Sequence, residues 1–223
     1  MDSFLLRLFF PPKCHFCKKV LSYQETDLCH SCRGDAPEFT RSKRNFLLIA
    51  HWTAVWYYKD NVANSIRRFK FYNARSYAHF FARSIAMHLK ENPFEQEIDI
   101  LTWVPISRKR RFLRGYDQSE LLAKALGKEL GIKPVRTLKK VRDTEPQSNI
   151  RDSAKRRANV LNAYRVVDDI ELKGNRVLLV DDVITTGATI SECAKTLMFS
   201  GTECVYAVAI AATKQRRNDK NRR

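Results

Sequence analysis

The chain has 223 residues, which suits one domain of ordinary size with a small addition. Hydrophobic residues make up 44% and charged residues 29%, as in soluble globular proteins, and no apolar run approaches the roughly 20 residues of a membrane helix. The apolar opening at Met1 to Phe10 lacks the basic start and the small-residue cleavage site of a secretion signal. We therefore expect a cytoplasmic protein without a membrane span.

The chain is strongly basic, with 41 lysines and arginines against 24 acidic residues and a formal net charge of +17. Such a charge creates a positive field that attracts polyanions. The basic residues cluster in Arg108 to Arg114, Arg151 to Arg157 and Lys214 to Arg223. Phosphate-bearing partners are therefore favoured, and a merely solvated basic surface is the alternative.

Four of the six cysteines lie near the N-terminus as two CxxC pairs, Cys14 with Cys17 and Cys29 with Cys32. Four thiolates that converge from two tight turns suit a tetrahedral structural zinc ion and leave no open position for catalysis. An iron–sulfur cluster and two disulfides are the alternatives, and disulfides would require an oxidising compartment.

Other cysteines and histidines are weaker candidates for ligands. His15 and His30 lie inside the two CxxC turns, where a histidine more often points away from the metal. Cys193 and Cys204 stand alone in apolar surroundings, so we expect small buried side chains without a role.

The composition changes once, near Arg41 to Arg44. We predict a zinc-binding module at residues 1–44, one larger domain at residues 45–213 and a disordered basic tail at residues 214–223.

Within the larger domain, hydrophobic periodicity predicts an alternation of helices and strands. The predicted helices are one or two in Asn64 to Leu89, one over Gln118 to Leu130 ended by Gly131, and one from about Ala188 to Phe199 closed by Gly201. The predicted strands are Ile98 to Val104, Val135 to Leu138, Ala163 to Val167, Arg176 to Asp181 and Glu203 to Ala211. The polar stretch Lys139 to Arg157 is interpreted as a mobile loop. This alternation predicts an α/β fold with a mainly parallel, twisted sheet covered by helices on both faces.

The segment Arg176 to Thr189 has the pattern of a phosphate-binding loop. A buried strand delivers two carboxylates, Asp181 and Asp182, to its carboxyl end, where ligands bind in open α/β sheets. Adjacent acids repel each other unless ribose hydroxyls or hydrated Mg²⁺ lie between them. The next residues offer backbone N–H groups and hydroxyls at a helix start, which together form an anion cradle. The residues of the cradle are Thr185, Thr186, Gly187, Ala188 and Thr189.

The run VLLVDDVITTGAT resembles the signature by which type I phosphoribosyltransferases bind 5-phosphoribosyl 1-pyrophosphate (PRPP). The resemblance implies that Asp181 and Asp182 hold the ribose hydroxyls, with Mg²⁺ bound alongside PRPP, and that Thr185 to Thr189 cradle the 5-phosphate. Hypoxanthine-type members carry a catalytic aspartate where this chain has Thr185, so no catalytic base is expected from this loop.

A second basic segment, from Pro105 to Ser119, follows the strand at Ile98 to Val104 and is expected to be a loop that faces the same crevice. A pyrophosphate leaving group needs cations there. Arg108 and Lys109 come first after the strand, so we predict that they contact the pyrophosphate. Gly115 is expected to permit a tight turn.

The wider pattern WVPISRKRRFLRGYDQSELLA, with TEPQ and RDSAKRRANV further on, resembles the competence-associated ComF family. In that family a cysteine zinc finger precedes a phosphoribosyltransferase-like domain. Members usually show RGFNQ where this chain has Arg114 to Gln118, so Tyr116 and Asp117 depart from the family pattern. Arg142 to Arg157 corresponds to the flexible loop that closes over the reacting centre in phosphoribosyltransferases.

Three functions remain open from the sequence. The first is a phosphoribosyltransferase that binds PRPP and Mg²⁺ and transfers the ribosyl group to an unidentified acceptor. The second is a protein of DNA uptake that handles single-stranded DNA, works with other uptake proteins and senses PRPP or a nucleotide in its pocket. The mixed stretch Arg67 to Tyr72 suits the second function, because cations and rings bind single strands, and a core role for its rings is the alternative. A purely regulatory PRPP sensor is a third possibility.

Overall fold

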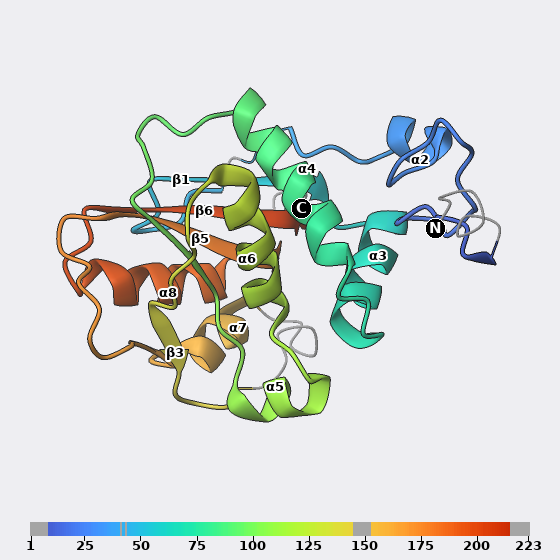
Figure 1. Ribbon diagram of the computed structural model, residues 1–223. Coiled ribbons are helices and arrows are strands. Elements are labelled where there is room, and N and C mark those ends of the chain that lie inside the picture. Colours follow the sequence, from blue (N-terminus) through green and yellow to red (C-terminus); the bar gives the residue numbers. More distant parts are fainter. Residues whose placement is uncertain (1–8, 41, 43, 145–152, 215–223) are drawn as a thin grey trace, which may run out of the picture.

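The computed structural model describes residues 9–40, 42, 44–144 and 153–214. A parallel sheet forms its centre, with the strand order β1-β6-β5-β2 (Figure 1). These strands are β1 (His51–Tyr57), β2 (Ile100–Trp103), β5 (Arg176–Ile184) and β6 (Cys204–Ala212). The predicted parallel sheet is therefore confirmed.

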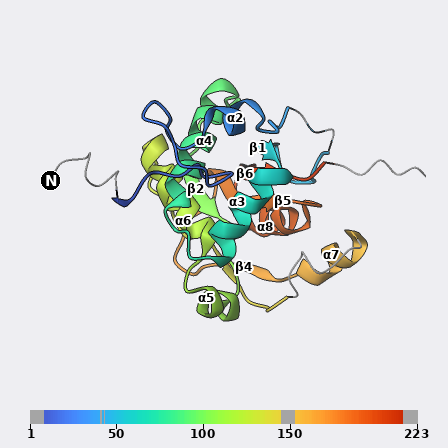
Figure 2. The same cartoon turned by 90° about the vertical axis from the view of Figure 1, so that its right-hand side faces the viewer.

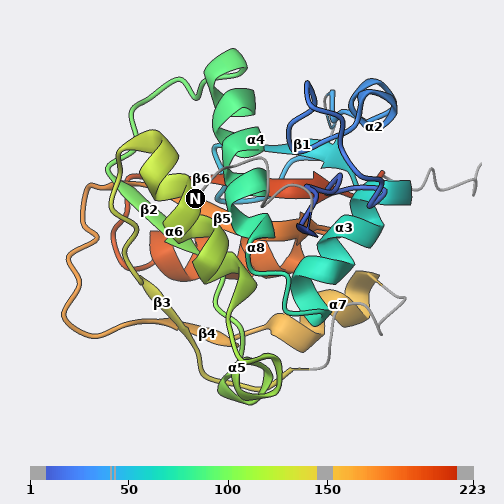
Figure 3. The same ribbon diagram turned by 45° about the vertical axis from the view of Figure 1, so that its right-hand side comes forward.

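Helices cover both faces of this sheet because β5 is apolar on both sides. Leu178 and Val180 point into one core, whereas Val177 and Leu179 point into the other, as successive side chains of a strand do. The first face packs against α3 (Asp60–Phe71), α4 (Tyr77–Glu91) and α6 (Gln118–Leu130), and the second against α8 (Ala188–Met198). Figures 1 and 3 show α4 and α6 on one side of the sheet and α8 on the other.

Local signals fix the ends of α6 as predicted. Asp117 caps its start, since Oδ1 accepts from the backbone N–H groups of Ser119 at 3.0 Å and Glu120 at 3.2 Å. Gly131 ends the helix with a φ of 71°, a conformation that favours glycine. Because asparagine is an equally good cap, the departure at position 117 leaves this role intact.

The basic segment after Pro105 is a helix and not the loop we expected. Ser107 begins α5 (Arg108–Arg114) by accepting a hydrogen bond from the backbone N–H of Arg110 at 3.3 Å. Gly115 ends α5 with a φ of 73°, which agrees with the predicted tight turn. Arginine and lysine are good helix formers, and this cap satisfies an amide that a loop would leave to water.

The segment between α6 and β5 also differs from the prediction. The strand expected at Val135 to Leu138 starts only at Leu138, because the N–H of Val135 bonds to Leu101 O in β2. The strand pairs antiparallel in a small second sheet. Of the polar stretch interpreted as a loop, residues 145–152 lie outside the described residues, and its two ends are ordered. The elements here are β3 (Leu138–Lys140), α7 (Ser153–Val160) and β4 (Tyr164–Val166).

The cysteine-rich module includes the short helix α2 (His30–Gly34) and packs on α3 and α4 (Figure 2). Its buried Phe16 lies 5.2 Å from Trp56 of β1 and 5.7 Å from Phe80 of α4, between ring centroids. The module therefore shares a core with the larger domain, and a division of the chain at residue 44 stays a prediction. None of the helices within the described part of the chain is long and apolar enough to cross a membrane.

Candidate functional site

The four N-terminal cysteines form one cluster. The Sγ atoms of Cys14, Cys17, Cys29 and Cys32 all lie within 4.8 Å of one another, and those of Cys17 and Cys29 are 3.6 Å apart. Zn–S bonds of about 2.3 Å in a tetrahedron place sulfur atoms about 3.8 Å apart, so this arrangement fits a zinc ion. The residues predicted as zinc ligands are therefore brought together.

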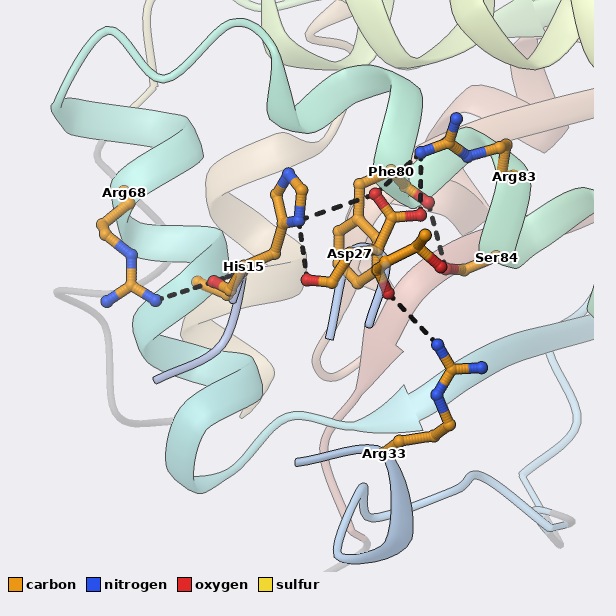
Figure 4. Close-up of polar contacts among 9 residues, drawn as sticks. His15, Asp27, Arg33, Arg68, Phe80, Arg83 and Ser84 are labelled. Carbon is orange, nitrogen blue, oxygen red and sulfur yellow. Dashed lines mark hydrogen bonds and ion pairs between the residues drawn. The ribbon is translucent and has the colours of Figure 1, made fainter. Parts of the chain in front are cut away.

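His15 points away from this cluster, toward α4. Its ring stacks on Phe80, with centroids 4.5 Å apart, and Nδ1 lies 2.9 Å from the carbonyl oxygen of Asp27 (Figure 4). Arg83 of α4 donates to both carboxylate oxygens of Asp27, at 2.7 and 2.8 Å. The first knuckle is thus fixed to the larger domain through His15 and Asp27, which are not metal ligands.

The two acidic residues predicted for the ribose site lie near the carboxyl end of β5. Asp181 Oδ1 accepts from the N–H of Asp182 at 2.8 Å and from Ser119 Oγ at 3.3 Å. Burial and the charge of Asp182 raise the pKa of Asp181 to about 8, and nearby Lys70 opposes this rise. A pair of carboxylates that holds a proton at neutral pH fits a cation or several hydroxyl donors, and a hydrated Mg²⁺ would meet both needs.

The predicted phosphate loop turns from β5 into α8 at Gly187. This residue has a φ of 82° and stands at the N-cap of α8. Thr186 Oγ1 accepts a hydrogen bond from the backbone N–H of Ala188 at 3.4 Å. The loop thus brings hydroxyls to the positive end of a helix, as an anion site requires.

A segment just before β1 packs on this loop. This contact was not predicted from the sequence. The Phe46 ring lies against Gly187, where a Cβ would come within 2.0 Å of it. The Arg44 guanidinium donates to the carbonyl oxygens of Thr185 and, at 2.9 Å, of Thr213. Phe46 is one of several apolar residues in its run, so the sequence carries no signal for this contact.

Two cations approach the acidic pair, and neither is among those predicted. Lys70 Nζ of α3 lies 2.7 Å from Asp182 Oδ1. Arg114, at the end of α5, is half-buried, and the charge of Asp182 acts on it. Arg108 and Lys109 are exposed in the first turn of α5, and Arg108 lines a separate cavity of about 730 Å³. Their contact with pyrophosphate stays a prediction.

Comparison with known families agrees with both parts of the structure. Residues 117–222 match the phosphoribosyl transferase domain family, and residues 5–43 match the double zinc ribbon domain family. With the parallel sheet and the cysteine cluster, these matches define a phosphoribosyltransferase-type protein that carries an N-terminal zinc ribbon.

Similarity to individual proteins indicates the family within this class. The chain is 31% identical to competence protein F of Haemophilus influenzae over 206 residues, which are 90% of this chain and 84% of that protein. It is 33% identical to DNA utilization protein YhgH of Salmonella typhi over 52% of this chain and 50% of that protein. It is 23% identical to competence protein ComFC of Bacillus subtilis over 84% of this chain and 78% of that protein. The chain belongs to the competence protein F (ComF) family, as its motifs predicted.

Proposed function

We propose that this protein binds PRPP with Mg²⁺ and transfers the phosphoribosyl group to an acceptor, with release of pyrophosphate. One observation carries the proposal: two half-buried carboxylates lie near the carboxyl end of a central parallel strand, and a threonine-rich loop leads from that strand into the N-terminus of α8. Asp181 and Asp182 would hold the ribose hydroxyls and the hydrated ion, and the residues from Thr185 to Thr189 would bind the 5-phosphate.

The reaction needs positioning more than a protein base in this loop. The acceptor's lone pair would attack C1 of the ribose while the bond from C1 to the pyrophosphate oxygen breaks, and pyrophosphate would leave with the electron pair. The acceptor would lose its proton to solvent or to a group outside the loop. Cations near the acidic pair favour departure of the anionic leaving group, which is where the charge develops.

The proposal is tested by calorimetric titration of the zinc-loaded protein with PRPP and Mg²⁺. We expect saturable binding that is weakened about 100-fold or more by the double substitution Asp181→Asn, Asp182→Asn, because the carboxyl groups that would hold the ribose hydroxyls and the hydrated ion are lost. The matched control is Asp168→Asn, Asp169→Asn. It changes another pair of consecutive aspartates, and the Asp168 side chain is 84% exposed. Equal affinity of the two double variants would refute the assigned site.

A second candidate function is binding of single-stranded DNA, which the similarity to DNA utilization protein YhgH also suggests. The stretch that mixes cations with rings divides in the structure: Phe69 is buried, whereas Phe71 is 60% and Tyr72 75% exposed. Arg114 lies over the Phe71 ring, 4.8 Å from its centroid. Exposed rings beside Lys70 and Arg114, whose charges act on Asp182, support base stacking along a bound strand.

DNA binding is tested by fluorescence anisotropy with a single-stranded oligonucleotide at rising salt. We expect affinity to fall steeply with salt, and Phe71→Ala, Tyr72→Ala to weaken binding about tenfold or more. Phe199→Ala is the control, since that ring directly follows α8 and is 77% exposed. Binding that depends on salt but not on Phe71 and Tyr72 would indicate general attraction to a basic protein and contradict a dedicated surface.

A further inference from the structure

Lys70 makes an ion pair inside the candidate site. It is the penultimate residue of α3, and its Nζ lies 2.7 Å from Asp182 Oδ1. The Lys70 side chain is 21% exposed and that of Asp182 13% exposed, so water screens this pair less than a surface pair. Its ammonium therefore occupies the side of Asp182 that a ligand cation would approach.

The end of α3 that carries Lys70 is fixed to the segment that links α5 and α6. Gln118 Nε2 donates to the carbonyl oxygen of Lys70 at 3.2 Å, and the Tyr116 hydroxyl donates to that of Phe69. Gln118 Oε1 also accepts from Arg114 Nη1 at 2.8 Å. One glutamine thus joins the backbone of Lys70 to the side chain of Arg114, and the charges of both cations act on Asp182.

The other contacts of α3 fix it to the first zinc knuckle (Figure 4). Arg68 donates to the carbonyl oxygens of His15, at 2.9 Å, and of Phe16. Ser65 Oγ donates to the same His15 oxygen at 3.0 Å. The contacts with the knuckle and with Gln118 hold α3 in place. Movement of the Lys70 ammonium relative to Asp182 therefore requires rotation of the Lys70 side chain and not a shift of the helix.

We propose that Lys70 is a ligand-contacting residue that exchanges Asp182 for the pyrophosphate group of the bound ligand. The inference rests on the proposed function. When Mg²⁺ or ribose hydroxyls satisfy Asp182, the ammonium loses its partner, and a half-buried charge without a partner is costly. A pyrophosphate on the α5 side supplies new charged acceptors within reach of the same side chain.

The test compares two ligands that differ only in the pyrophosphate. Calorimetry with Mg²⁺ and either PRPP or ribose 5-phosphate is applied to wild type, Lys70→Met and Lys70→Arg. We expect Lys70→Met to weaken PRPP binding about tenfold or more, Lys70→Arg to restore part of it, and ribose 5-phosphate binding to change by less than about twofold. Arg67→Met is the matched control, an exposed cation on the same helix. Thermal melting verifies folding, and Lys70→Gln replaces Lys70→Met if that variant unfolds.

Each other outcome has a definite meaning. If Lys70→Met binds PRPP as well as or better than wild type, the lysine only blocks Asp182, and the inference is overturned while the proposed function stands. Equal weakening for both ligands would show that Lys70 acts through Asp182 and not at the pyrophosphate, which also overturns it. Absence of PRPP binding by the wild type would instead remove the proposed function itself.

Discussion

Removal of zinc by a chelator is expected to lower the melting temperature of the protein by about 10 °C or more, a loss of roughly 5 kcal/mol. The cysteine-rich module matches the zinc ribbon family over residues 5–43, and a unit of that size is too small to fold through its own apolar contacts. Its buried residues Phe16 and Leu28 share a core with Trp56 and Phe80, so loosening the module exposes the larger domain as well. Differential scanning fluorimetry with and without chelator measures the change.

Cys17→Ser separates metal binding from packing. Cys17 is the one exposed residue of the four-cysteine cluster, so without metal its replacement costs little. With zinc bound, the same substitution removes a thiolate ligand and should reproduce most of the effect of chelation. Cys204→Ser is the control for a cysteine outside the cluster. A Cys17→Ser variant that binds one zinc ion and melts like wild type would rule out the four-thiolate site.

Binding of PRPP with Mg²⁺ is expected to strengthen by about 100-fold between about pH 6 and about pH 9, because Asp181 must lose its proton to accept ribose hydroxyls. Burial, reinforced by the charge of Asp182, raises the pKa of Asp181 to about 8. The acidic pair therefore holds a proton at neutral pH, and the ionised fraction falls about tenfold for each pH unit below that pKa. The affinity for PRPP therefore rises with pH and reaches a plateau above pH 8.

Carbon NMR of the aspartate carboxyl groups in the free protein measures the same proton directly. One carboxyl should titrate near pH 8, far above the ordinary range of aspartate. Asp182→Asn removes the repelling charge and should move the midpoint down, whereas Lys70→Met removes a favourable charge and should move it up. If every aspartate titrates below about pH 5, the pH dependence of binding must come from the ligand.

The contact of Phe46 with Gly187 relates the two halves of the chain. Together with Arg44, which bonds to Thr185 O, it brings the residues that follow the zinc ribbon onto the predicted phosphate loop. On the other side, α3 joins the first knuckle to Lys70. The zinc ribbon is therefore connected by two separate routes to the two ends of the candidate site.

Features that depend on neighbouring residues could be predicted from the sequence. The CxxC spacing brings two thiolates to each turn, Asp117 and Gly131 set the ends of α6, and the apolar run before Asp181 defines a strand buried on both faces. Each follows from short-range geometry or from the two-residue period of a strand, so no knowledge of distant contacts is needed.

Which distant side chains meet at the site depends on how the helices and strands pack, and the sequence did not predict it. Lys70 and Asp182 are far apart in the sequence, and the mixed stretch that contains Lys70 favoured a core role for its rings without indicating where Lys70 points. The structure divides that stretch by helix face, with Phe69 inside, Phe71 outside and Lys70 turned to the acidic pair. Composition cannot reveal such a division, because the partner of each face is set by how the helices pack across the sheet and not by the residues beside it.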